Sequence, residues 1–370
     1  MFCKVISAAI LGLEVIPIWV EADVSDGMPS FNMVGYASVE VREAQDRVRT
    51  ALKNMGIVLP PKRITINLSP ADIRKEGSRF DLPIAAAVLM ALGRIPPGSL
   101  DHTLLIGELG LDGCVQGVTG VLPTVAAAQE MGCSHCIVPM ENAAEGETIR
   151  KIHVVGIDRL QDLILFCCTG MIPHSEKEFE KDGKNGIKAV QTREGTVDFA
   201  EISGQQMAKR AALIAAAGFH NLLMLGPPGS GKSMIARRLP TILPELSEEE
   251  SLEITRIYSI AGLLPKDQPL IKSRPFRAPH HTISPQALSG GGRNPVPGEI
   301  TLAHLGVLFM DELPETSRRT LEILRQPLEE RKIEISRVNG RFTFPAFFLL
   351  VGAMNKETSI LIQTDMPVAA

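Results

Sequence analysis

The sequence predicts an α/β protein of two domains, the second of which has a parallel sheet carrying a phosphate-binding loop. Three observations support this. The chain has 370 residues, which is more than one compact core normally holds. In its second half, short apolar strands alternate with helices, a pattern typical of parallel sheets. A glycine-rich motif directly follows the first of these strands.

The composition excludes several classes of protein. Hydrophobic residues make up 45% and charged residues 22%, the balance of a globular chain and not of a disordered one. The net charge of −4 gives no overall cationic field, so any contact with a polyanion has to be local. No apolar run approaches the roughly 18 to 20 residues that cross a bilayer, and six cysteines are too few for a disulfide framework. We therefore expect a cytoplasmic protein without membrane contact.

The first domain is expected over residues 1–172, as a mixture of helices and strands. Helical spacing of apolar residues predicts a helix over 41–55, and period-two alternation predicts a strand over 63–68. Continuous apolar sequence predicts a buried helix over 82–92. A further helix is expected over 123–131, with Pro123 at its start.

Cys133 and Cys136 form a lone C-x-x-C motif in this domain. Without a second pair at ligand spacing, buried small residues and a metal or redox site both remain open interpretations.

Charged residues and glycines crowd the stretch 173–198, which predicts a solvated linker. The second domain is expected over 199–355. Its predicted strands lie at 222–225, 307–310 and 347–351. Ser247 followed by Glu250 forms a capping box, which predicts a helix from that point.

The glycine-rich motif has the form G-x-x-x-x-G-K-S and lies between a strand and a helix, the setting that a P-loop requires. Its residues are Gly226, Pro227, Pro228, Gly229, Ser230, Gly231, Lys232 and Ser233. The glycines let backbone N–H groups converge on phosphate oxygens, and Lys232 neutralises the β- and γ-phosphates. Ser233 supplies a hydroxyl for Mg²⁺. The motif thus predicts a site for ATP and Mg²⁺.

Acidic residues follow the predicted strand at 307–310. Asp311 is expected to hold Mg²⁺, and Glu312 to orient and deprotonate the attacking water. Asn355 follows the next strand, where an amide contacts the γ-phosphate or the water, although an Asn there can also be only a turn residue. Glu312 and Asn355 together favour hydrolysis over binding alone.

The stretch between Ser233 and Asp311 is longer than one crossover helix and a strand require, so we expect an insertion. Its basic residues are Lys272, Arg274, Arg277 and Arg293, with no acidic residue from Ile271 to Asn294. This stretch is the candidate contact for a polyanion, with a solvated loop or a subunit contact as alternatives. His280 and His281 are interpreted as hydrogen-bonded loop residues rather than ligands.

An Asn339-Gly340 pair between two alternating runs predicts a β-hairpin. Arg337 and Arg341 flank its turn. These arginines either project toward a polyanion or protect the edge of the hairpin from aggregation.

Longer motifs surround these residues. The chain reads INLSPADIRKEGSRFDLPIAAAVL at 66–89, RPFRAPHH at 274–281, PGEITLAH at 297–304 and LFMDELPE at 308–315. In these motifs the chain resembles the magnesium-chelatase-like AAA+ ATPases of the YifB/ComM type. The resemblance extends over nearly all of residues 1–355.

The resemblance implies a ribosomal-S5-domain-2-like first domain, similar to the Lon protease domain, and an AAA+ second domain. It implies Walker A roles for Gly229, Lys232 and Ser233, Walker B roles for Asp311 and Glu312, and a sensor 1 role for Asn355. It also implies an ATP-driven hexamer that moves DNA branches in natural transformation, with the basic insertion and the hairpin toward DNA.

Two departures from the family pattern stand out. The positions of the Lon-type Ser–Lys dyad hold Arg79 and Leu122, so peptidase activity is not expected. The tail at 356–370 diverges, and the arginine finger and helical lid of the family are missing. We therefore expect a C-terminally truncated member with impaired hydrolysis and assembly. The alternatives are a non-DNA AAA+ machine, either a metal-chelatase subunit or a protein-remodelling chaperone, and an ATP-binding module without turnover.

Overall fold

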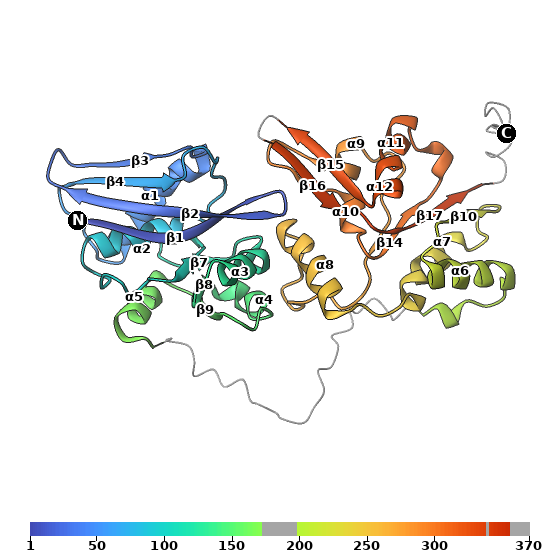
Figure 1. Ribbon diagram of the computed structural model, residues 1–370, viewed down its shortest axis with the longest axis horizontal. Helices are drawn as coiled ribbons and strands as arrows, with labels where there is room; N and C mark the ends of the chain where they lie inside the picture. Colours follow the sequence, from blue (N-terminus) through green and yellow to red (C-terminus); the bar gives the residue numbers. More distant parts are fainter. Residues whose placement is uncertain (172–197, 338–339, 356–370) are drawn as a thin grey trace, which may run out of the picture. The chain divides into compact units, whose positions relative to one another are not determined.

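The computed structural model describes residues 1–171, 198–337 and 340–355. They form two compact units, one containing residues 1–171 and the other residues 198–263 and 270–355 (Figure 1). The predicted linker up to residue 197, the predicted tail and Asn339 of the hairpin turn lie outside the described residues. Within the described part, no helix is long and apolar enough to span a bilayer.

A mixed seven-stranded sheet, in the order β3-β4-β2-β1-β5-β8-β9, forms the first unit. Its strands are β1 (Phe2–Leu11), β2 (Glu14–Ser25), β3 (Ser30–Val34), β4 (Arg63–Ser69), β5 (Thr103–Leu105), β8 (His135–Pro139) and β9 (His153–Ile157). β1 and β2 form an antiparallel hairpin, whereas β5, β8 and β9 run parallel to β1. A separate antiparallel pair consists of β6 (Glu108–Leu109) and β7 (Val115–Gln116).

The helices of the first unit are α1 (Val39–Asn54), α2 (Asp81–Ala91), α3 (Val121–Glu130), α4 (Ala143–Gly146) and α5 (Leu160–Thr169), with a 3-10 helix at Met140–Asn142. Ser38 caps the start of α1, because its Oγ accepts a hydrogen bond from the N–H of Val41 at 3.4 Å. Every residue of α2 is buried, as its continuous apolar sequence predicts. Both helices contribute to the main core of the unit.

The helix expected from Pro123 begins two residues earlier, at Val121. Gly120 precedes it in a left-handed conformation, with φ 71°, and so sets the start of the helix. Pro123 is tolerated inside the first turn because the first N–H groups of a helix have no partner within it.

The two positions compared with a peptidase dyad are both interior. The Nη2 of Arg79 donates to the carbonyl oxygen of Thr119, and burial lowers the pKa of Arg79 to about 10 against the opposing charge of Glu145. The N–H of Leu122 donates to Glu145 Oε1 at 2.8 Å. Where a Lon-type dyad has its nucleophile and its base, this chain therefore has a buried arginine and a leucine.

Cys133 and Cys136 are also buried, and burial raises the pKa of both thiols. Among the described residues, no group of three His, Cys, Asp or Glu side chains is arranged to hold a metal ion. These observations favour the interpretation of the two cysteines as small core residues.

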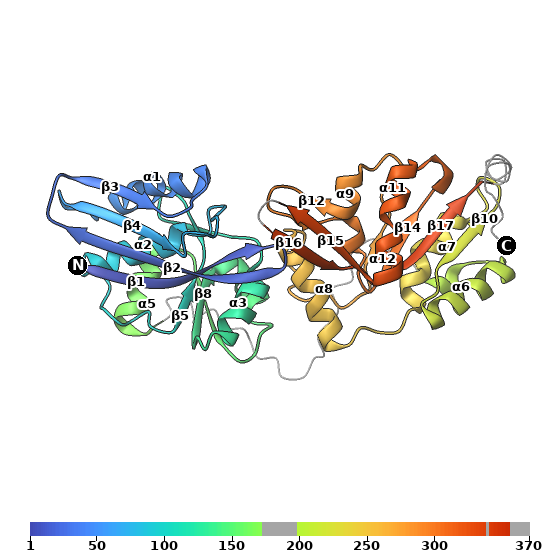
Figure 2. The same ribbon diagram turned by 45° about the horizontal axis from the view of Figure 1, so that its top comes forward.

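A four-stranded parallel sheet, in the order β10-β17-β14-β11, forms the centre of the second unit. Its strands are β10 (Leu222–Leu225), β11 (Phe276–Arg277), β14 (Val307–Met310) and β17 (Leu349–Met354). β10, β17 and β14 lie side by side in both views (Figure 2). Two antiparallel hairpins accompany the sheet, β12 (Gly290–Gly291) with β13 (Val296–Pro297) and β15 (Lys332–Arg337) with β16 (Gly340–Pro345).

The helices of this unit are α6 (Gln206–Gly218), α7 (Lys232–Arg238), α8 (Glu248–Ile260), α9 (Pro285–Ser289), α10 (Glu299–Leu302), α11 (Arg318–Ile323) and α12 (Arg325–Glu330). Three 3-10 helices lie at Phe199–Glu201, Leu239–Ile242 and Leu313–Glu315. The predicted capping box is present, since Ser247 Oγ accepts from the N–H of Glu250 and the carboxylate of Glu250 accepts from the N–H of Ser247.

Two details differ from the sequence prediction. The last strand begins at Leu349 and not at Phe347. The basic insertion also contains a strand, β11, which forms one edge of the sheet. Only Phe276 and Arg277 belong to it, and two residues are too few to show strand periodicity.

Candidate functional site

The P-loop joins the end of β10 to the start of α7. Gly229 and Gly231 adopt left-handed conformations, with φ 76° and 85°, which glycine takes without strain. The loop borders a cavity of about 320 Å³. Its lining residues are Pro228, Gly229, Ser230, Gly231, Lys232, Ser233, Met234, Asp311, Glu312 and Asn355.

The Lys232 amine lies inside the loop. Its Nζ donates to the carbonyl oxygens of Gly226 and Pro227, at 2.9 and 3.0 Å, and to Asn355 Oδ1 at 3.2 Å. The predicted Walker A lysine and the predicted sensor 1 amide therefore contact each other, although they are far apart in the sequence.

Ser233 and Asp311 are joined by a hydrogen bond of 3.0 Å, from the serine Oγ to the carboxylate Oδ2. A hydroxyl and a carboxylate side by side, next to an open cavity, form a donor set of the kind that Mg²⁺ uses with water and phosphate oxygens. The residues present thus fit Mg²⁺.

Sheet topology explains why these side chains meet. β14 and β17 are parallel neighbours, so Asp311 and Asn355, which directly follow these strands, lie together at the carboxyl ends of the strands. Gly226 at the start of the P-loop donates its N–H to the carbonyl oxygen of Met354 at 3.3 Å.

Glu312 adopts a left-handed backbone conformation, with φ 48°, at the rim of the cavity. Its Oε2 lies 3.0 Å from His281 Nδ1. The sequence does not predict this contact, because His281 belongs to the basic insertion, far from Glu312 along the chain. His280 bonds Thr282 through its Nδ1 at 2.8 Å, the loop role predicted for it.

Gln205 makes a second contact with the site, to the P-loop, that the sequence does not predict. Its Nε2 donates to the carbonyl oxygen of Ser230 at 3.1 Å. The residue directly precedes α6 and has a left-handed backbone conformation, with φ 52°. A Gly-Gln pair preceding an apolar helix was the only available signal.

Two of the four basic residues expected to face a polyanion are engaged inside the protein. The side chain of Arg274 is only 8% exposed and donates to the carbonyl oxygens of Pro244 and Leu305, at 2.6 and 2.7 Å. Arg277 forms a bidentate pair with Glu299, at 2.6 and 2.7 Å, which raises the pKa of the guanidinium. These contacts favour a structural role for Arg274 and Arg277, which hold β11 and its flanks in place, over the predicted polyanion contact.

Lys272 and Arg293 are exposed, as are Arg337 and Arg341 of the hairpin. Arg337 donates from Nε to the carbonyl oxygen of Gly292 at 3.0 Å, which joins the tip of β15–β16 to the tip of β12–β13. Arg341 pairs with Glu334.

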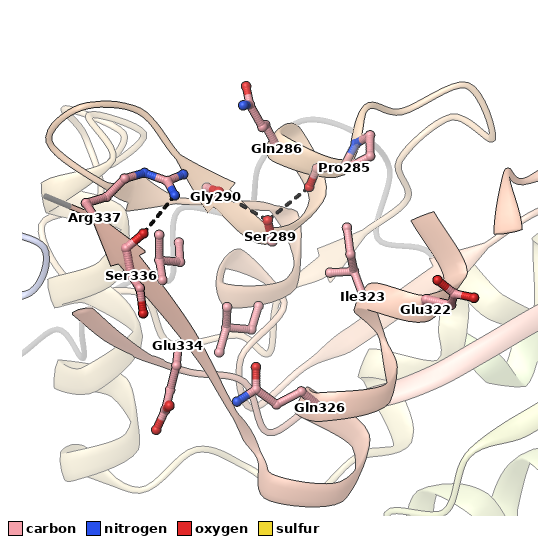
Figure 3. A pocket seen from close by; sticks show the side chains of 12 residues that line it. Pro285, Gln286, Ser289, Gly290, Glu322, Ile323, Gln326, Glu334, Ser336 and Arg337 are labelled. Atoms are coloured by element: carbon pink, nitrogen blue, oxygen red, sulfur yellow. Dashed lines mark hydrogen bonds between the residues drawn. The ribbon is translucent and has the colours of Figure 1, made fainter. Parts of the chain in front are cut away.

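A second cavity of about 350 Å³ lies along β15. Figure 3 shows Arg337 and Gly290 at one end of it and Gln326 at the other. Its walls come from α9, α11, α12 and β15, so it is separate from the P-loop cavity.

Comparison with known proteins gives two family matches. Residues 198–365 match the model for magnesium chelatase, subunit ChlI, and residues 20–142 match the model for subunit ChlI of Mg-chelatase. Both units thus carry sequence signals of one family.

Individual relatives agree with these matches. An uncharacterized protein YifB of Salmonella typhimurium is 44% identical over 352 residues, which cover 94% of this chain and 66% of the relative. Competence protein ComM of Haemophilus influenzae is 44% identical over 361 residues, 95% of this chain and 68% of the relative. Lon protease 2 of Bacillus subtilis is 31% identical over 121 residues, 32% of this chain and 21% of the relative. The chain spans about two thirds of the length of the YifB and ComM relatives that it matches.

Proposed function

Because this chain belongs to the YifB/ComM family of magnesium-chelatase-like AAA+ ATPases, we propose that it binds ATP with Mg²⁺ at the P-loop and uses hydrolysis to remodel branched DNA. The proposal includes a cytoplasmic location and assembly into a hexamer, the state that the family resemblance implies. We also propose that the two domains extend over residues 1–172 and 199–355.

The observation that carries the nucleotide site is the meeting of Lys232, Ser233, Asp311 and Asn355 around one cavity. Lys232 would exchange its carbonyl acceptors for the β- and γ-phosphates. Ser233 and Asp311 would hold Mg²⁺, which when bound neutralises phosphate charge. Asn355 would then be free to contact the γ-phosphate or the attacking water.

Glu312 is the proposed general base. A carboxylate at the rim, next to the γ-phosphate position, can orient a water and accept its proton. Its contact with His281 occupies Oε2 and restrains the carboxylate, while Oε1 remains available to a water.

DNA contact is assigned to the exposed cations at the two joined tips. Arg293 and Arg337 lie on adjoining hairpins, and Arg341 follows in β16. Backbone phosphates are the fitting ligand, since the described residues of the tips offer positive charges and no stacked aromatic platform.

A metal-chelatase subunit is the second candidate, favoured by the match of residues 198–365 to the ChlI model. Such a subunit would also hydrolyse ATP, but DNA would not change its rate.

Steady-state ATP hydrolysis, measured with no DNA, with single-stranded DNA and with a four-way junction, tests the proposal. We expect stimulation by the junction in the wild type and no hydrolysis in Lys232→Ala. Hydrolysis that ignores DNA would favour the chelatase alternative, and nucleotide binding without hydrolysis would leave an ATP-binding module.

A further inference from the structure

The second cavity, which borders β15, has a mixed apolar and polar lining that the proposed nucleotide site does not use. Its volume of about 350 Å³ reaches the range of small-molecule sites, about 300 to 1,000 Å³. Ile323 of α11 and Ile333 and Ile335 of β15 provide apolar surface. Gln286 and Gln326 each provide an amide with a donor and an acceptor. A small, flat molecule with polar edges therefore suits this cavity.

The cavity lies along one edge of β15 and not over one of its faces. Five consecutive residues of the strand, 333–337, line it, although neighbouring side chains of a strand point to opposite faces. β16, the partner strand on the other edge, contributes no lining residue. The backbone of β15 on the side away from β16 therefore faces the cavity.

The register of the hairpin identifies the backbone groups on that side. The N–H of Ala346 donates to the C=O of Arg331, which lies opposite it, at 2.9 Å. Because a strand alternates the direction of its peptide groups, the C=O of Glu334 and the N–H of Ser336 point away from β16, next to each other. The described residues give neither group a hydrogen-bond partner. An acceptor and a donor are thus available side by side.

The carboxylates at the cavity are already paired. Glu334 accepts from Lys332 Nζ at 2.9 Å and also pairs with Arg341, and Glu322 pairs with Arg318 at 3.4 Å. Figure 3 shows the carboxylate of Glu322 directed away from β15. Amide and peptide groups therefore dominate the polar lining that is left for a ligand, which suits an uncharged molecule.

The cavity lies beside the proposed DNA surface. Arg337 and Gly290 line one end of it, and Arg337 also binds Gly292 of the neighbouring tip (Figure 3). A DNA strand whose phosphates lie on Arg293 and Arg337 would therefore hold one of its bases next to this end of the cavity.

From this geometry we infer that the cavity receives a single nucleobase turned out of the stack of a DNA strand, an inference that rests on the DNA contact proposed above. The base lies between the isoleucines of α11 and β15, and its polar edge pairs with the C=O of Glu334 and the N–H of Ser336. Every base has a donor and an acceptor next to each other on its Watson–Crick edge, so the site does not require one sequence.

An extended peptide suits this edge less well than a base. The C=O of Ser336 already accepts from Arg337 Nη1 at 3.0 Å. The remaining free backbone groups form too short a row for the pairing of a second strand.

Fluorescence of 2-aminopurine, a base analogue that brightens when it leaves the stack, tests the inference. The full chain is titrated into a single strand that contains this analogue, while the anisotropy of an end label measures binding. We expect the fluorescence to rise as the strand binds. A base-free strand with the same phosphates should bind more weakly than the intact strand.

Two substitutions on α9 form a matched pair. Ser289→Leu places a larger apolar side chain in the cavity, so it should lose the fluorescence rise and bind the intact and the base-free strand alike. Ala287→Leu adds the same side chain on the exposed surface of α9, outside the cavity, and should behave like the wild type. Because each protein is compared on two strands, a general loss of stability does not imitate the expected result.

A wild type that binds the strand without a fluorescence rise, or that binds the base-free strand equally well, overturns the inference and leaves the proposed phosphate contact intact. So does a fluorescence rise that Ser289→Leu retains. A chain that binds no DNA at all overturns the proposed DNA contact and this inference together.

Discussion

At the residue scale, Lys232 is the most direct test of the nucleotide site. Its amine donates to carbonyl oxygens of its own loop, the position in which it would meet phosphate oxygens. Lys232→Ala should weaken ATP binding by at least about thirtyfold, since losing one partner of a close charge pair costs about 2 to 5 kcal/mol. Titration with a fluorescent ATP analogue measures the change.

Glu312→Gln is the control in the same titration. It should keep the affinity of the wild type, because Asp311 and Ser233 remain to hold Mg²⁺, and it should lose hydrolysis. Equal affinities for the wild type and Lys232→Ala would contradict the assignment of the site.

His281 makes a second prediction at this scale. Its ring holds the Glu312 carboxylate at 3.0 Å, so His281→Ala should raise basal hydrolysis without changing ATP affinity. About tenfold is expected, since freeing a charged group from one hydrogen bond is worth about 1.5 kcal/mol. His280→Ala, which removes the neighbouring ring, is the control. A fall in rate would mean that His281 assists Glu312 instead of restraining it.

His304 predicts a pH dependence of stability. Burial lowers its pKa from the ordinary value of 6.5, against the opposing effect of Glu253. The unfolded chain therefore binds more protons below that value, and the second unit should lose stability as the pH falls below 6.5. Calorimetry at about pH 7 and about pH 5.5 measures the loss.

The matched variant is His304→Asn. Its side-chain oxygen can replace Nδ1 as the acceptor of the Phe347 N–H, a bond of 3.0 Å, but it does not titrate. The difference in stability between the two pH values should shrink in this variant. An undiminished difference would place its cause in other groups.

At the element scale, the sequence predicts best where one local signal is sufficient. The capping box at Ser247 and the P-loop between β10 and α7 are local and are present in the structure. β11 was missed because it exists through pairing with β14 and not through its own two residues. The contacts of Arg274, Arg277 and His281 were missed because their partners lie on other elements.

The two joined tips can be tested as one element. Replacing Arg293, Arg337 and Arg341 with alanine should weaken binding to single-stranded and branched DNA alike. The slope of log affinity against log salt should fall by roughly 0.7 to 0.9 for each lost phosphate contact. Affinity measured at several salt concentrations shows this.

Arg277→Ala is the contrasting variant. It should lower the melting temperature, because Glu299 is left without its partner, and leave the salt slope unchanged. An unaltered slope in the triple variant would remove the tips from the proposed DNA surface.

At the scale of the whole molecule, the nucleotide residues all belong to the second unit, while the single tryptophan, Trp19, lies in β2 of the first. Mg²⁺ with a non-hydrolysable ATP analogue at a hundredfold excess over Kd should raise the melting of the second unit by about 5–10 °C. Trp19 fluorescence should report an unshifted transition. Equal shifts by calorimetry and fluorescence would show that the two units unfold together.

The bond from Arg337 to Gly292 joins the tips of the two hairpins. One hairpin lies in the chain between β11 and β14, and the other leads into β17. In the sheet, β11 and β17 flank β14 on either side. The two hairpins are therefore continuous in the chain with both strands that border β14, the strand directly followed by Asp311 and Glu312.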